Sequence, residues 1–213
     1  GLVLHPPVLA LGVGCERGVG EGELAALARE TLERAGLAAG AVACVASLDL
    51  KSDEEAVHAL ARDLGVPARF FTATELESEA GRLANPSDTV FEAVGCHGVA
   101  EGAALAAAGA GGALAAEKTR SKRATCAVAR APGCIEPNSV GRPRGRLAVL
   151  GIGPGAAAWR TPEAAHALAG AAHVVGHGLY LDLIADAIGG KARHETPLGE
   201  EEARVAKALD LAA

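Results

Sequence analysis

Acid–base chemistry is suggested by a group of charged side chains in the segment "VACVASLDLKSDE". The apolar run at 42–48 predicts a buried strand, and four charged residues follow it: Asp49, Lys51, Asp53 and Glu54. Ligands of α/β proteins bind beyond the carboxyl ends of such strands. A carboxylate there can position water and a lysine can stabilise an oxyanion. Asp49 or Glu54 is a candidate base and Lys51 its partner, and a loop that caps the next helix is the alternative, above all for Asp53.

Two more candidates lie in other segments. Glu101 is a lone carboxylate at the first turn of a helix of small residues, 99–108. It either faces a ligand or interacts with the helix dipole. Arg17, in "GVGCERG", follows the first predicted strand and suits a carboxylate or an oxyanion. Cys15 is expected to be a packed thiol, because no neighbouring histidine could act as its base.

A basic strip crosses the middle of an acidic chain. Between Glu117 and Arg146 there are eight basic and two acidic residues, although the net charge of the chain is −6. This distribution indicates a small polyanionic ligand rather than nucleic acid, and the 2% of aromatic residues leaves little for bases to stack on. The candidate binding residues are Lys118, Thr119 and Arg120 at a predicted hairpin turn. A solvated turn is the alternative.

Alternating patterns predict an α/β layered domain, with a mixed and mostly parallel sheet, over 1–130. Short apolar runs predict strands at 8–13, 42–48 and 68–71. Helical periodicity and stop signals predict helices at 21–35, 53–64, 87–93 and 99–108, with a further helical turn capped by Thr72 or Thr74. The segment at 112–130 predicts two strands around the basic turn.

The pattern is interrupted and then restarts. Residues 131–145 contain three Pro and three Gly without periodicity, which predicts a linker. The following segments predict a strand at 146–152, a helix at 161–169, a strand at 172–175, and helices at 179–187 and 200–212. About 68 residues are too few for a free-standing parallel α/β domain. We therefore expect 146–213 to be the start of a truncated second α/β domain.

A glycine loop, "GIGPG", follows the predicted strand at 146–152. Gly151, Gly153 and Gly155 would allow close backbone approach to a ligand and Pro154 would stiffen the turn. The dinucleotide fingerprint would require glycine at 156, where this chain has alanine. A cofactor loop and a structural turn both fit this pattern.

The string "GRLAVLGIGPGAAAWRTPEAAHALAGAAHVVGHGLYLDLI" resembles the start of the tetrapyrrole methylases, in particular precorrin-3B C(17)-methyltransferase. Those enzymes hold S-adenosylmethionine between two α/β domains. The resemblance implies a homodimer through this part, much cofactor contact outside this chain, and cofactor-binding roles for Gly151, Gly153, Pro154, Gly155 and Tyr180. Ala156 stands where many relatives have an acidic residue, so that polar role is absent here.

Residues 8–130 resemble the C-terminal domain of cobalt-precorrin-5A hydrolase. The ordered motifs are "GVGCERG", "SLDLKSDE", "FFTATEL", "NPSDTVFEAVGCHGVAEGAAL" and "EKTRSKRATCAVAR". The resemblance implies hydrolytic opening of a ring lactone with release of acetaldehyde. Its candidate catalytic groups are Asp49, Lys51, Glu54 and Glu101. Cations suit the acidic arms of a precorrin, and the candidate substrate-binding residues are Arg17, Lys118, Thr119 and Arg120. His97 could bind cobalt or a proton, or it could be an ordinary loop residue.

The composition of the chain limits the remaining classes of protein to which it could belong. No apolar run approaches the ~20 residues that span a bilayer, and no secretion signal is visible. Five cysteines without C-x-x-C spacing favour reduced thiols. We therefore expect a cytoplasmic protein without nucleic acid or membrane partners and without a metal site of its own.

Together these features predict a fragment of a bifunctional protein of corrin-ring synthesis. Its substrate would be a precorrin or cobalt-precorrin and its cofactor S-adenosylmethionine, with the rest of the hydrolase and of the methylase as partners. The alternative is a non-catalytic carrier domain that binds the precorrin for the attached methyltransferase. Convergence of Asp49, Lys51 and Glu101 in one cleft would favour the hydrolase, whereas cations and backbone donors alone would favour the carrier.

Overall fold

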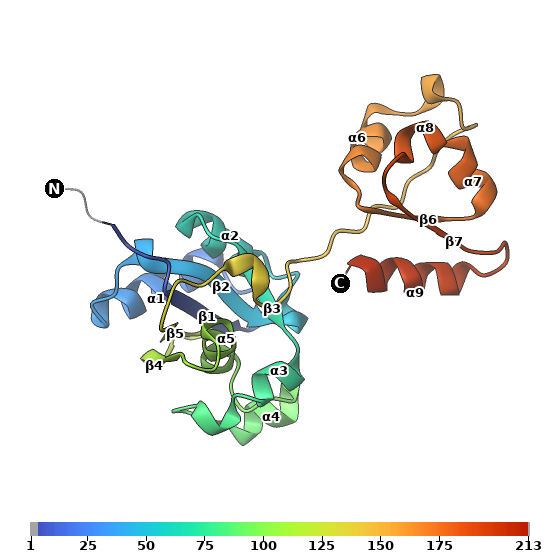
Figure 1. Cartoon of the computed structure of the whole chain (residues 1–213). Helices are drawn as coiled ribbons and strands as arrows, with labels where there is room; N and C mark the ends of the chain where they lie inside the picture. Colours follow the sequence, from blue (N-terminus) through green and yellow to red (C-terminus); the bar gives the residue numbers. More distant parts are fainter. Residues whose placement is uncertain (1–3, 213) are drawn as a thin grey trace. The chain divides into compact units, whose positions relative to one another are not determined.

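The computed structural model describes residues 4–212, and the chain divides into two compact units, 1–144 and 145–213 (Figure 1). The first unit contains a sheet with the strand order β3-β2-β1-β5-β4. The strands are β1 (Leu9–Cys15), β2 (Val42–Leu48), β3 (Ala68–Phe71), β4 (Ala113–Arg120) and β5 (Ala124–Arg130). The predicted mixed sheet is confirmed. It is not mostly parallel, however, because β1, β2 and β3 make two parallel pairings and the β4–β5 hairpin adds two antiparallel ones.

Helices cover both faces of this sheet. One face packs against α1 (Glu21–Arg34) and α2 (Glu55–Leu64), and the other against α3 (Ala73–Glu77) and α5 (Val99–Ala108), as Figure 1 shows. A short helix, α4 (Asp88–Val94), precedes α5. Each face has its own buried apolar cluster, because side chains alternate along a strand.

Small residues bring α5 very close to the sheet. A Cβ at Gly12 in β1 would lie 1.9 Å from the carbonyl oxygen of Ala100 in α5, so only glycine fits at this position. Eight of the ten α5 residues are buried, and Glu101 is one of them. The alanine-rich composition therefore produces a thin, tightly packed layer rather than a bulky core.

The loops that carry the candidate residues meet at one edge of the sheet. Cys15, the last residue of β1, pairs with Ala124, the first residue of β5. The turn at 121–123 consequently lies beside the loop that follows β1, and the loop that follows β2 lies at the same edge because β1 and β2 are parallel. We call the loops 16–20, 49–54 and 121–123 the carboxyl edge.

The predicted linker belongs to the first unit for most of its length. Arg69 in β3 donates hydrogen bonds to the carbonyl oxygens of Val140 (2.6 Å) and Gly141 (2.8 Å). Phe70 forms an antiparallel bridge with Arg142, and Ile135 is buried. The segment at 131–142 is therefore attached to the first unit at Ile135 and at 140–142, although its composition resembles that of a linker.

The second unit contains a two-stranded parallel sheet and four α-helices within the described residues. Its elements are α6 (Pro162–Gly170), β6 (His173–Gly176), α7 (Gly178–Leu183), α8 (Ala185–Ile188), β7 (Ala192–Glu195) and α9 (Glu201–Ala212). The predicted strand at 146–152 does not form. Val149 is 93% exposed, and the segment pairs with neither β6 nor β7. The predicted helix at 179–187 is interrupted at Ile184, and β7 was not predicted.

No helix within residues 4–212 has the length and apolar character needed to cross a membrane.

Candidate functional site at the carboxyl edge

Arg17 links the loop after β1 to the loop after β2. Its guanidinium donates to both carboxylate oxygens of Asp53, at 2.6 and 2.7 Å, and to the carbonyl oxygen of Leu50 at 3.0 Å. The hydrogen bond from Arg17 lowers the pKa of Asp53 below its ordinary value. The predicted substrate-binding Arg17 therefore already has an internal partner, although its side chain remains 62% exposed.

The Glu54 side chain also bonds to the loop after β1. Its side chain is 7% exposed, and its carboxylate accepts the backbone N–H of Gly18 at 3.0 Å and lies 3.6 Å from the Arg17 guanidinium. A buried carboxylate that is bonded in this way stabilises the loop. This geometry favours a structural role for Glu54 over the predicted role of base.

Arg123, in the turn between β4 and β5, bonds this turn to the loop after β1. Its side chain donates to the Glu16 carboxylate (2.9 Å) and to the carbonyl oxygens of Arg17 (2.7 Å) and Gly18 (3.1 Å). The sequence placed Arg123 in the basic strip but gave no sign of this role, because its partners lie more than 100 residues away along the chain.

Glu101 is a fully bonded buried carboxylate. One oxygen accepts the backbone N–H groups of Ala84 (3.0 Å) and Asn85 (2.9 Å), and the other accepts the Asn85 amide and the backbone N–H of Lys118, both at 2.9 Å. Burial raises the pKa of Glu101, but the hydrogen bonds from Asn85 and Lys118 outweigh it and leave the pKa lowered. Glu101 thus joins α5, the loop at 83–87 and β4, which favours a structural role.

The three candidates on β4 face different surroundings. Thr119 is turned toward α1, where its hydroxyl lies 2.6 Å from that of Thr31, so it is not available to a ligand at the surface. The Lys118 ammonium donates to the carbonyl oxygen of Asn85, and burial, with Arg120 beside it, lowers the Lys118 pKa. Arg120 is exposed. Of the three candidates, Arg120 is therefore the one whose charge is most accessible to a ligand.

Asp49 and Lys51 lie in a 3₁₀ turn directly after β2 and are half-buried. Within residues 4–212 neither side chain forms a hydrogen bond or an ion pair. Lys51 is close enough to Cys15 to influence its thiol, whose pKa is raised by burial and lowered in part by Lys51, Arg123 and Arg17. Among the described residues, the carboxyl edge therefore holds one unpaired carboxylate, that of Asp49, and two unpaired ammonium groups, those of Lys51 and the exposed Lys122.

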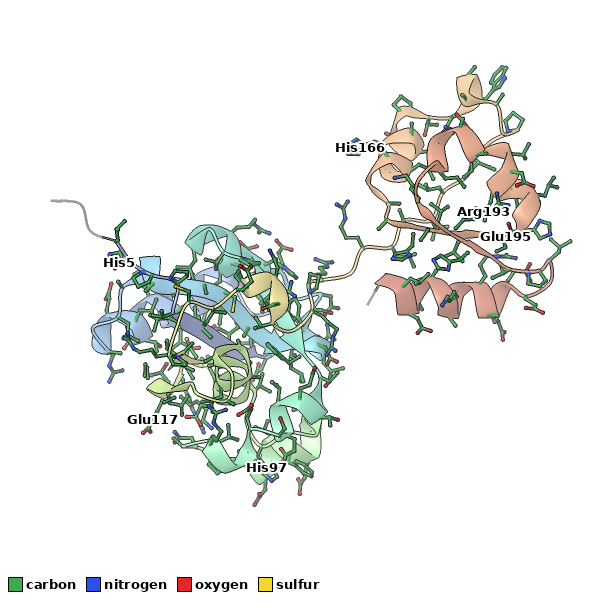
Figure 2. All side chains as sticks on the ribbon, viewed as in Figure 1. His5, His97, Glu117, His166, Arg193 and Glu195 are labelled. Carbon is green, nitrogen blue, oxygen red and sulfur yellow. The ribbon has the colours of Figure 1, made fainter. Side chains whose placement is uncertain are left out.

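A further titratable pair adjoins the site. His97, in the turn before α5, lies with its ring Nδ1 2.8 Å from the carboxylate of Glu77 in α3, and its backbone N–H donates to the same carboxylate at 2.9 Å (Figure 2). These bonds lower the pKa of Glu77. Burial raises the pKa of the adjacent Cys96, and both Glu77 and Asp49 raise it further. Glu77 and Asp49 are thus within electrostatic range of one buried thiol, which the sequence did not indicate.

In the second unit the glycine loop has the backbone that its sequence predicts. Gly153 (φ +59°) and Gly155 (φ +96°) adopt left-handed conformations that other residues avoid, and Gly151 borders open space. A Cβ at Gly155 would meet the side chain of Leu183 in α7. Tyr180, also in α7, is half exposed and contacts His177 edge to face.

Among residues 4–212, no group of three or more His, Cys, Asp and Glu side chains could hold a metal ion.

The first unit is thus a three-layer α/β domain with a polar edge formed by two strand–helix loops and a hairpin turn. Residues 9–129 match the family described as cobalamin synthesis G C-terminus, and the chain belongs to this family.

The chain is similar to two curated relatives and one solved structure over this region. It is 51% identical to "Protein CobE" of Sinorhizobium sp over 121 residues, which cover 57% of this chain and 79% of the relative. It is 34% identical to the cobalt-precorrin-5A hydrolase of Priestia megaterium over 132 residues, 62% of this chain but only 34% of that enzyme. The crystal structure of a CobE from the cobalamin biosynthetic pathway superposes with a TM-score of 0.55 at 36% identity, covering 61% of this chain and 94% of the other.

A third relative matches a shorter stretch. The cobalamin biosynthesis protein CbiHC of Archaeoglobus fulgidus is 44% identical over 69 residues, which are 32% of this chain and 16% of that protein. These similarities place the chain in cobalamin biosynthesis.

Proposed function

We propose that the first unit opens the ring lactone of a cobalt-precorrin by hydrolysis, a step that leads to release of acetaldehyde. Asp49 would accept a proton from the attacking water, and Lys51 would stabilise the oxyanion that develops on the lactone carbonyl. The observation that carries the proposal is that Asp49 and Lys51 are unpaired at the carboxyl edge, whereas Glu54 and Glu101 are bonded to backbone N–H groups. The 34% identity to a cobalt-precorrin-5A hydrolase supports the same reaction class.

The proposal is tested with the 213-residue chain and cobalt-precorrin-5A by trapping the released acetaldehyde. Asp49→Asn should lower the rate about 100-fold or more, since a general base contributes that much. Asp63→Asn, on the exposed surface of α2, is the matched control and should leave the rate unchanged. Binding of the substrate without release of aldehyde would contradict the hydrolase and favour the precorrin carrier.

We infer that the second unit is the part of a precorrin methylase that contributes a glycine loop to the S-adenosylmethionine site. The left-handed Gly153 and Gly155 and the open space at Gly151 support this role. The 44% identity to the cobalamin biosynthesis protein CbiHC over 69 residues supports a role of the chain in cobalamin biosynthesis. Gly151, Gly153, Pro154, Gly155 and Tyr180 remain the proposed contacts.

Equilibrium dialysis of labelled S-adenosylmethionine against the 213-residue chain tests this second assignment. Gly151→Val should abolish retention of the cofactor, because the added side chain would fill the space beside the loop without disturbing a neighbour. Gly170→Val also adds a side chain in open space and serves as the control. Equal retention by the wild type and Gly151→Val would contradict a cofactor role for the loop.

A further inference from the structure

The imidazole of His97 is held in one orientation. Glu77 accepts from the backbone N–H of His97 and lies 2.8 Å from Nδ1, while the ring of Phe91 stacks on the imidazole with centroids 4.4 Å apart. A carboxylate can only accept, so Nδ1 carries the hydrogen. In the neutral ring Nε2 then carries the free lone pair. Figure 2 shows His97 beside α4, at the border of the first unit.

This arrangement is typical of histidines that bind metal ions. Such a histidine donates its second N–H to a carboxylate or carbonyl, which fixes the ring and raises its basicity. The His97 side chain is 28% exposed, and the neighbour of Nε2 is Asp88, 3.6 Å away with a 98% exposed side chain. An incoming ligand could therefore displace Asp88 and reach Nε2.

The surroundings of His97 do not supply a complete coordination sphere. Within residues 4–212 no cluster of three or more metal-binding side chains is present. One oriented imidazole therefore suits a metal ion that arrives with most of its ligands already attached. A cobalt ion inside a tetrapyrrole ring meets this condition, because the ring supplies the in-plane nitrogens and leaves an axial position open. Imidazole is a suitable ligand for such transition metals.

A cation lies close to the same segment of chain. The backbone N–H of Ser87 donates to the carbonyl oxygen of His97 at 2.8 Å. Two residues earlier, the carbonyl oxygen of Asn85 accepts the ammonium group of Lys118. The imidazole and a lysine thus flank one short loop, so a ring held at His97 would bring its carboxylate arms near β4.

We propose that His97, oriented by Glu77, supplies Nε2 as an axial ligand to the cobalt ion of a cobalt-containing tetrapyrrole. On binding, an Nε2–Co bond forms and the water at that axial position leaves, with no change in oxidation state. The inference rests on the proposed function, in which the first unit binds a precorrin, and adds a preference for the cobalt-containing ring over its metal-free form.

The experiment compares two probes with the 213-residue chain: cobyrinic acid with exchangeable axial water, and hydrogenobyrinic acid, its metal-free counterpart. The wild type should bind the cobalt compound about tenfold more tightly or better, with a shift of its absorption bands. The electron paramagnetic resonance spectrum of the cobalt(II) form should show hyperfine splitting from one axial nitrogen. His97→Ala should remove this splitting and reduce cobyrinic acid binding to the level of hydrogenobyrinic acid.

Two further variants separate orientation from ligation. Glu77→Ala should weaken binding of the cobalt compound by up to the loss seen in His97→Ala, about tenfold, because the imidazole would no longer be oriented. His166→Ala removes an exposed histidine from the second unit and should change neither probe. The axial-ligand role of His97 would be overturned if the wild type showed no nitrogen splitting, or if the splitting persisted in His97→Ala. If both probes still bound the wild type in that case, the proposed function would stand. Failure of both probes to bind the wild type would overturn both.

Discussion

The carboxylate of Glu101 accepts the backbone N–H of Lys118 at 2.9 Å, and a buried charge thereby joins α5 to β4. Each of its two oxygens accepts two N–H groups, and the residue is 1% exposed. The charge is compensated by these hydrogen bonds and by the nearby Lys118 cation. Loss of an acceptor oxygen would leave donors unsatisfied in the interior.

Glu101→Gln should destabilise the first unit by about 3 kcal/mol. Whichever oxygen becomes the amide, its N–H₂ group would face two donors. Urea unfolding, followed by circular dichroism, measures the loss as a lower midpoint. Glu117→Gln is the matched control on the exposed surface, where the carboxylate has only a 3.4 Å contact with Asn85, and it should change stability by less than about 0.5 kcal/mol.

The difference in stability between the wild type and Glu101→Gln should depend on pH. Because the pKa of Glu101 is lower in the folded state, its contribution is complete above the unfolded pKa of about 4.3. It is lost as the pH falls through the lower folded value. The difference between the wild type and Glu101→Gln should therefore shrink in acid, and a difference that grows in acid would contradict the proposed charge state of Glu101.

Local signals were sufficient for much of the first unit. The predicted strands at 42–48 and 68–71 and the helix at 99–108 have the observed bounds, because apolar runs there are bordered by glycine, proline or charged residues. Thr72 caps α3 together with Glu75 in a capping box. The prediction of a strand at 146–152 was wrong because local signals were not sufficient there. Its apolar pattern is compatible with a strand, but a strand forms only where a neighbour accepts its backbone hydrogen bonds.

The candidate site was predicted in position but not in its contacts. Parallel strands place Asp49, Lys51 and Arg17 at one edge, and that inference needs only the topology. The partners of Glu54 and Glu101 lie 36 and 17 residues away, and pairings at such distances leave no periodic trace in a single sequence. The sequence therefore indicated which carboxylates were unusual and could not distinguish bonded carboxylates from free ones.

Arg120→Ala should weaken binding of hydrogenobyrinic acid to the chain in a way that depends on salt. Arg120 is exposed and pairs with Thr125 close to the carboxyl edge, where the acidic arms of a corrinoid would need a cation. An exposed charge pair contributes up to about 1 kcal/mol, so we expect a loss of roughly two- to fivefold at low ionic strength. The difference should fade as salt is added, because screening weakens exposed pairs first.

Arg130→Ala is the matched control for this last prediction. Arg130 is also exposed and lies on the same hairpin, but it pairs with Leu9 at the opposite end of β1. Its loss removes the same charge from the chain and should leave corrinoid binding unchanged in an absorbance titration. If Arg120→Ala and Arg130→Ala weaken binding equally, net charge rather than the carboxyl edge attracts the ligand. If only Arg120→Ala does so, the acidic arms of the corrinoid lie beside the β4–β5 turn.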